Sequence, residues 1–296
     1  MAVRFIIDSA SDIVPAEAEA HGLIHIPMKV IFGEEEYSDS VDLTHREFYE
    51  KLIENDEIPT TSQINPGVFM SAYQKVVDEG DTAVVITLSG KLSGTYQSAM
   101  IALDGFEDKI FVVDSESVCV GERILIQLGL KLRDQGLSAA EIAAELDLQK
   151  KHVRVLALLD TLEYLKKGGR ISAAVAFAGN LLSIKPVIAI ENGEVSLVGK
   201  ARGSKKGNNL LRELITNCGG INFDMPFCLA YSGLSDSMLQ KYIADSGLSD
   251  RLLQKYIEDS SEIWSSHAET LPISTVGCTI GTHAGPGAVA VAFFEN

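Results

Sequence analysis

The chain has 296 residues, of which 46% are hydrophobic and 22% are charged, a composition that excludes disordered, collagen-like and coiled-coil proteins. Its 41 acidic and 25 basic residues give a net charge of -16, which argues against binding to nucleic acid or to an anionic membrane surface. Four cysteines without a CxxC pair, and no recognisable signal peptide or membrane-spanning run, predict a cytoplasmic protein with reduced thiols.

The first half of the chain alternates short apolar runs with helical patterns. The runs that we expect to be strands are 3–7, 23–30, 83–88 and 110–113. Helices are expected over 15–22, 44–55 and 66–80, and from residues 95, 120 and 138, where Thr44 with Glu47 and Ser138 with Glu141 form capping boxes. This alternation is typical of βαβ crossovers, so it predicts a mainly parallel sheet with helices on both faces.

A second α/β unit follows residue 160. Asn192-Gly193 between two apolar runs predicts a β-hairpin over 187–198, and hence a mixed sheet. Helices are expected over 161–167, 172–180 and 205–217, and strands over 227–231 and 288–294. We therefore predict an α/β fold with two domains, 1–160 and 161–296, and a segment 60–80 that can pack with the second domain.

One internal repeat lies in the second unit. The pattern of residues 234–246 recurs at 248–260, a shift of 14 residues. Two copies are too few for a solenoid, which needs at least about three. We expect this duplication (234–260) to lengthen a surface helical segment, and the alternative is an added surface for docking a partner.

The common motifs of catalysis are not found in the sequence. The Gly-Lys pair at 90–91 lacks the upstream glycine and the following Ser or Thr of a P-loop. No GxGxxG follows a strand, and neither HExxH nor GxSxG occurs. The sequence therefore disfavours nucleotide-dependent, metal-dependent and nucleophile-elbow chemistry.

Polar loops follow or precede several expected strands, at residues 8–12, 60–63, 89–95 and 114–115. Ligands of open α/β sheets bind beyond the carboxyl ends of strands. In the third loop, Ser93-Gly94-Thr95 opens a helix, and this pattern fits either an anion site or an ordinary helix cap. The loop 281–287 is expected to be a tight turn with His283 at its tip, serving either an anionic ligand or the structure alone. Basic clusters at 166–170 and 200–206 suit an anionic ligand or a solvated surface.

Eight motifs in a fixed order give the chain its resemblance to a known family. They are DSASD (8–12), TSQINP (61–66), LSGTYQSA (92–99), VVDSESV (112–118), DTLEYLKKGGRIS (160–172), LLSIKPVIAIENGEV (181–195), GKARGSKK (199–206) and IGTHAGPGA (280–288). In this order and spacing the chain resembles the bacterial DegV family of lipid-binding proteins, which includes the fatty-acid-binding subunit of fatty-acid kinase. Ile64, Asn65 and the duplication depart from the family pattern.

The resemblance implies a carrier without a catalytic residue, metal or cofactor, which holds one long-chain fatty acid between its domains. By the matching motifs, the ligand-binding residues are Thr61, Ser62, Ser93, Gly94, Thr282 and His283. The resemblance further implies that the carboxylate is presented to a separate, ATP-binding fatty-acid kinase and phosphorylated to acyl phosphate. Arg170 and Arg202 would then face the head group or the kinase.

Burial of the acyl chain supplies the affinity in this interpretation. About 15 methylenes at roughly 0.8 kcal/mol each give about 12 kcal/mol before the costs of association. The small apolar residues of segment 172–178 suit a helix that borders such a chain, or equally a tightly packed helix between domains. Two alternatives stay open. One is a regulatory lipid sensor without a kinase partner, and the other is an acyl hydrolase with Ser93 as nucleophile and His283 as base.

Overall fold

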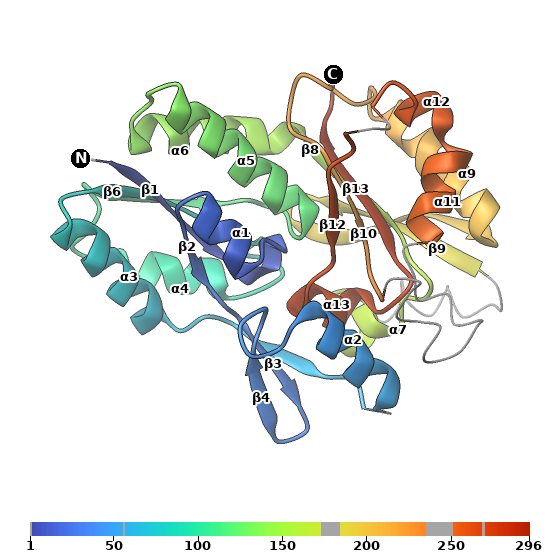
Figure 1. Ribbon diagram of the computed structural model, residues 1–296, viewed down its shortest axis with the longest axis horizontal. Helices are drawn as coiled ribbons and strands as arrows, with labels where there is room; N and C mark the ends of the chain where they lie inside the picture. The colour runs from blue at the N-terminus through green and yellow to red at the C-terminus, as the bar shows by residue number, and fades with distance from the viewer. Residues whose placement is uncertain (1, 56, 173–183, 235–250, 268–269) are drawn as a thin grey trace.

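The structure is a computed structural model that describes residues 2–55, 57–172, 184–234, 251–267 and 270–296 (Figure 1). Its first sheet is parallel throughout, with the strand order β2-β1-β6-β7. These strands are β1 (Val3–Asp8), β2 (Leu23–Ile26), β6 (Thr82–Thr87) and β7 (Ile110–Asp114). Every residue of β6 is buried, as expected of a parallel strand that is covered on both faces.

Helices cover both faces of this sheet. On one face, Ile6 and Val85 pack with residues of α3 (Pro66–Asp78) and α4 (Thr95–Ile101). On the other, Ile7 and Ile86 pack with α5 (Val120–Asp134) and α6 (Ala139–Gln149). The remaining helices of this half are α1 (Pro15–Ala20), α2 (His45–Glu54) and the 3-10 turns η1 (Ser9–Ser11) and η2 (Lys150–His152). Both predicted capping boxes, at the starts of α2 and α6, are confirmed.

The second sheet is mixed and has the strand order β10-β9-β8-β13-β11-β12. Its strands are β8 (Val153–Leu158), β9 (Ile184–Glu191), β10 (Glu194–Arg202), β11 (Cys228–Tyr231), β12 (Ile273–Thr275) and β13 (Val289–Phe294). The predicted hairpin is confirmed, because β9 and β10 pair antiparallel around Asn192 and Gly193, whose φ angles of 50° and 81° are those of a tight hairpin turn. The predicted fold class is therefore confirmed. The division near residue 160 stays a prediction, and β8, which precedes it, pairs with β9 and β13.

A third, antiparallel sheet was not predicted. It has the order β4-β3-β5 and consists of β3 (Lys29–Phe32), β4 (Glu35–Ser38) and β5 (Thr60–Ser62). The single strand expected over 23–30 is divided into β2 and β3 by Pro27, which has no backbone N–H to donate to a sheet. Strand β5 carries Thr61 in this sheet, whereas α3, which follows it, packs against α4 and β6.

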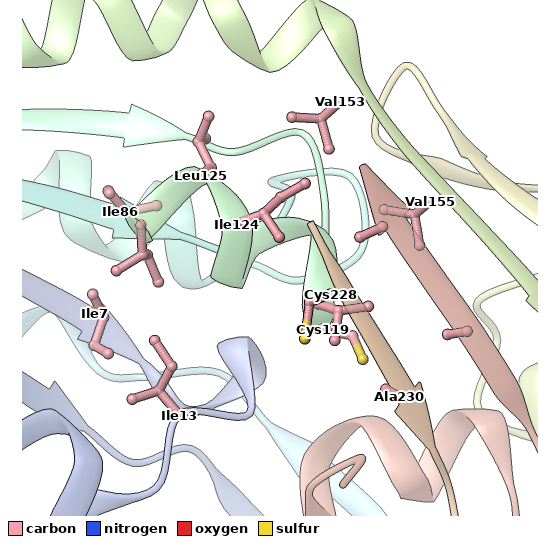
Figure 2. Close-up of a cluster of buried hydrophobic side chains, with 14 of the residues drawn as sticks. Ile7, Ile13, Ile86, Cys119, Ile124, Leu125, Val153, Val155, Cys228 and Ala230 are labelled. Carbon is pink, nitrogen blue, oxygen red and sulfur yellow. The ribbon is translucent and has the colours of Figure 1, made fainter. Parts of the chain in front are cut away.

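Helix α5 lies between the two large sheets and joins their cores (Figure 2). Its residues Ile124 and Leu125 are fully buried among Ile7 and Ile86 of the first sheet and Val155 of the second. Its first two turns, residues 120–126, are buried on all sides, as expected of a helix enclosed between two layers. The two α/β units therefore share one continuous hydrophobic core, and this core fixes how the sheets face each other.

The opposite face of the mixed sheet is covered by α9 (Ser204–Asn217), α11 (Arg251–Asp259) and α12 (Ser261–Trp264). Helix α11 belongs to the second copy of the duplication, and its Leu253 and Tyr256 are 1% and 0% exposed. The expectation of a surface segment is wrong for this copy, because its amphipathic face completes the core. Most of the first copy, and the helix predicted over 172–180, lie outside the described residues. None of the helices in the described ranges is long and apolar enough to cross a membrane.

Candidate functional site

A largely apolar cavity lies where the two α/β units meet. Its volume is about 90 Å³, below the range of about 300–1,000 Å³ for pockets that enclose a whole small molecule. Its apolar lining residues are Met28, Leu88, Leu92, Val118, Leu165, Ile188, Ile190, Val195, Ile280 and Ala284. Its polar lining residues are Thr61, Ser93, Arg170, Thr279 and His283. Four of the predicted site residues, Thr61, Ser93, Arg170 and His283, are thus brought to one cavity.

His283 lies on a helix rather than at the tip of a turn. Helix α13 (Cys278–Ala284) includes most of the segment that we expected to be a tight turn. Gly285 follows it with a φ of 71°, and Pro286 cannot continue a helix, so the turn begins only there. The prediction of a turn around His283 is therefore wrong. The glycines and proline of this motif end the helix one residue after the imidazole.

The imidazole of His283 is hydrogen-bonded to Thr61, which is far away in the sequence. Its Nε2 lies 2.9 Å from Oγ1 of Thr61, whereas Nδ1 is buried and has no hydrogen-bond partner among the described residues. Gly168 permits this position, because a Cβ there would lie 2.1 Å from Nδ1. Burial, and secondarily the positive charge of Arg170, lowers the pKa of His283 to about 4. The imidazole is therefore neutral at physiological pH.

The polar loop 89–95 lies between β6 and α4. Ser93 lines the cavity, and its Oγ lies 3.0 Å from Oγ1 of Thr95. Gly94 is the N-cap of α4 but does not line the cavity, and a Cβ on it would lie 1.9 Å from Oε1 of Gln63. Because glycine has no Cβ, Gln63, the residue after β5, packs directly against the start of α4. This contact holds Ser93 beside the cavity.

Arg170 lies at the mouth of the cavity, because it lines both the cavity and an open groove beside it. It follows α7 (Glu163–Lys167), and its guanidinium donates to the carbonyls of Leu92 at 3.0 Å and Gly168 at 2.6 Å. Burial lowers the pKa of this arginine, but a guanidinium stays charged at any physiological pH. The cavity thus carries one cation at its mouth, next to the loop of Ser93 and the glycine that contacts His283.

Three other predicted site residues lie away from the cavity. Ser62 is on β5, opposite Lys29. The hydroxyl of Thr282 is buried and donates to the carbonyl of Cys278 at 2.9 Å. Arg202 is exposed at the end of β10 farthest from the hairpin turn, opposite Ile184. None of the three is among the residues that line the cavity.

Sequence reasoning missed Thr279 and the lining that comes from the hairpin. Thr279 lines the cavity from the first turn of α13, four residues before His283. A spacing of four places two residues on one helix face, so the signal existed, but the turn predicted for this segment concealed it. Ile188, Ile190 and Val195 come from the hairpin, whose place beside the first unit depends on tertiary structure. At the hairpin turn, the hydroxyl of Ser89 from the first unit donates to the carbonyl of Gly193 at 2.7 Å.

Buried acidic groups anchor the start of α13. Asp39 accepts hydrogen bonds from the backbone N–H groups of Cys278 and Thr279, at 3.3 and 3.0 Å, and Asp12 accepts one from Gly277 at 2.9 Å. Carboxylates are favourable at a helix N-terminus. Burial raises the pKa of Asp12 to about 7. Asp39 also lies with His45 and Cys278 in a group whose potential metal-ligand atoms are within 4.8 Å of one another. In this structure, however, both Asp39 oxygens cap α13.

The arrangement defines a class of ligand. A mostly apolar lining with a few polar groups and one arginine fits an amphiphile with an anionic end, rather than a nucleotide or a sugar. The fold is that of an α/β protein with a cavity between its two units.

The chain belongs to the DegV family, whose model, described as an uncharacterised protein family, matches residues 2–296. A DegV domain-containing protein of Caldanaerobacter subterraneus is 31% identical over 300 residues, covering 99% of each chain. Among solved structures, DegV of Bacillus subtilis, a fatty acid binding protein, is 30% identical with a TM-score of 0.80. A DegV family protein from Thermus thermophilus, described for its fatty acid binding, is 28% identical with a TM-score of 0.82. Both matches cover 100% of both chains.

Proposed function

We propose that this chain binds one long-chain fatty acid, with its carboxylate against Thr61, Ser93 and His283 and the start of its acyl chain in the cavity. The observation that carries this proposal is the cavity itself, in which these three residues and Arg170 interrupt an apolar lining. The fatty acid binding of the relatives from Bacillus subtilis and Thermus thermophilus supports it. A neutral imidazole, two hydroxyls and one guanidinium can together satisfy a carboxylate, and the guanidinium supplies the positive charge that balances it.

We further propose that the bound carboxylate is presented to a separate kinase and converted to acyl phosphate. Acyl-chain burial supplies enough affinity that the polar groups need not enclose the head group fully. In this role Gly94, Ser62 and Thr282 support the carboxylate site through the backbone and packing around it. Arg202 serves the kinase or the product, since a guanidinium can pair with phosphate oxygens in a fork geometry.

The test measures lipid binding and kinase-coupled phosphorylation on the same proteins. Ser93→Ala and His283→Ala should lower phosphorylation by an order of magnitude or more, and lower lipid affinity less, because burial of the acyl chain masks the lost contacts. Arg202→Ala should bind fatty acid within a few-fold of wild type but give little acyl phosphate with an added cognate kinase and ATP. Lys205→Ala, an exposed neighbour of the same basic cluster, is the matched control. Equal phosphorylation by all variants rejects presentation to a kinase, while lipid binding is judged separately.

Two other functions use the same residues. A hydrolase needs Ser93 within reach of an oriented imidazole, yet Ser93 is bonded to Thr95 while His283 is bonded to Thr61. The unpartnered Nδ1 of His283 also lacks the orienting group of a catalytic triad. A regulatory sensor without a kinase would share the whole pocket. Turnover of an ester substrate identifies the hydrolase, and a pull-down that recovers no kinase favours the sensor.

A further inference from the structure

One hydroxyl in the cavity has no partner in the structure. Thr279 is 2% exposed, lines the cavity, and its Oγ1 accepts or donates no hydrogen bond among the described residues. Its backbone N–H, by contrast, is held by Asp39 at 3.0 Å, so the residue is fixed in place. A buried hydroxyl without a partner is costly, and a ligand atom that bonds it recovers that cost.

Thr282 on the same helix shows what an ordinary buried threonine does here. It is 1% exposed, and its hydroxyl donates to the carbonyl of Cys278 one turn earlier, at 2.9 Å. Thr279 lies in the first turn of α13, and its hydroxyl makes no such bond. The two threonines have the same chemistry, helix and burial, but only Thr279 offers a free hydroxyl to the cavity.

We propose that Thr279 selects acyl ligands that carry a hydroxyl group close to the carboxyl end, as in a 3-hydroxy fatty acid. This inference rests on the proposed fatty acid site, whose carboxylate is held at His283. Residues four apart on a helix have Cβ atoms about 5–6 Å from each other, so Thr279 faces the ligand a short distance beyond the carboxylate. A hydroxyl on the third carbon lies within a few bonds of the carboxyl group and reaches that position.

The apolar part of the cavity lining favours this assignment over a second contact to the carboxylate. Met28, Leu88 and Ile280 line the same cavity and offer no polar side-chain atoms except a weakly accepting sulfur. Arg170 and His283 are close together, since burial and then the charge of Arg170 lower the pKa of His283. A carboxylate gains more beside that charge, and a neutral hydroxyl is the group that a lone threonine in an apolar wall can satisfy.

The test compares 3-hydroxypalmitate with palmitate in a competition assay on delipidated protein. Wild type should prefer the hydroxylated ligand by about tenfold, since one satisfied buried hydroxyl is worth of the order of one power of ten in affinity. Thr279→Val, which keeps the shape of the side chain, should abolish that preference. Thr282→Val is the matched control and should retain it.

Two results would overturn this assignment. One is equal affinity of wild type for both ligands, and the other is a preference that survives in Thr279→Val. If Thr279→Val keeps the preference but binds both ligands more weakly by the same factor, its hydroxyl instead contacts the carboxylate. In each case wild type still binds fatty acid, whereas failure of wild type to bind either ligand would instead reject the proposed function.

Discussion

Thr61 and His283 are 222 positions apart in the sequence, and their side chains meet at 2.9 Å. One comes from the short strand β5 and the other from the last turn of α13. The bond therefore depends on two segments that only the complete fold brings together. It also explains why neither residue alone marks a site in the sequence.

Gly168 controls the position of the imidazole. In Gly168→Ala, the new methyl group would lie 2.1 Å from Nδ1 of His283, so we expect the ring to be displaced and fatty acid affinity to fall by about tenfold or more. Gly169→Ala is the control, because a Cβ there meets nothing within 4 Å although its φ of 70° strains an alanine. The control should lose about 1 kcal/mol of stability and keep its affinity. The role of Gly168 is rejected if both variants bind equally well in a fluorescence displacement assay.

His283 should make the stability of the protein depend on pH. Its pKa is about 4 in the folded protein and about 6.5 when unfolded, so the unfolded chain binds more protons between these values. The stabilising contribution of the neutral ring is present above pH 6.5 and is lost as the pH falls towards 4, by about 3 kcal/mol. Urea denaturation of wild type and His283→Gln at several pH values measures it. Parallel curves for the two proteins over this window would contradict the buried neutral ring.

The hydrogen bond from Ser89 to the carbonyl of Gly193 should hold the hairpin against the first unit. Ser89→Ala leaves a buried carbonyl without this donor, so we expect unfolding to become easier by about 1 to 3 kcal/mol. Lys91→Ala, in the same loop and exposed, should change stability by less than about 0.5 kcal/mol. Denaturant midpoints that agree for wild type and Ser89→Ala would show that this contact contributes nothing.

The second copy of the duplication should be essential to the core. Leu253 is 1% exposed in a cluster with Leu211 and Trp264, so Leu253→Ala should lower the free energy of unfolding by about 2–5 kcal/mol. Lys255→Ala, on the exposed side of the same helix, should have almost no effect. Thermal unfolding of the two variants separates them. A Leu253→Ala protein as stable as wild type would instead support the surface segment that the sequence predicts.

The local chemistry of the sequence accounts for much of the fold. The capping residues Thr44 and Ser138 and the Asn192-Gly193 turn act through contacts with near neighbours, so their patterns are visible in the sequence itself. The three-stranded sheet around β3 was missed because Pro27 divides one apolar run into two strands with different partners. The burial of α11 was missed because an amphipathic helix does not reveal in its sequence which element it will cover.

The site was predictable only in part, for the same reason. Thr61, Ser93 and His283 were found through ordered motifs, not through any local feature that requires them to meet. Thr279 was missed because the glycines around His283 suggested a turn, whereas the capping carboxylates of Asp12 and Asp39, far away in the sequence, support a helix there. Helix α13 is thus specified by tertiary contacts at its start and by Gly285 at its end.

The lipid content of the purified protein tests the central proposal most directly. Native mass spectrometry of freshly purified protein from a bacterial host, followed by denaturing extraction and lipid mass spectrometry, counts the ligands per chain and gives their masses. We expect about one long-chain fatty acid per chain, released on denaturation and replaced when another fatty acid is added. Protein that carries no acyl species and takes up no added fatty acid would contradict the account.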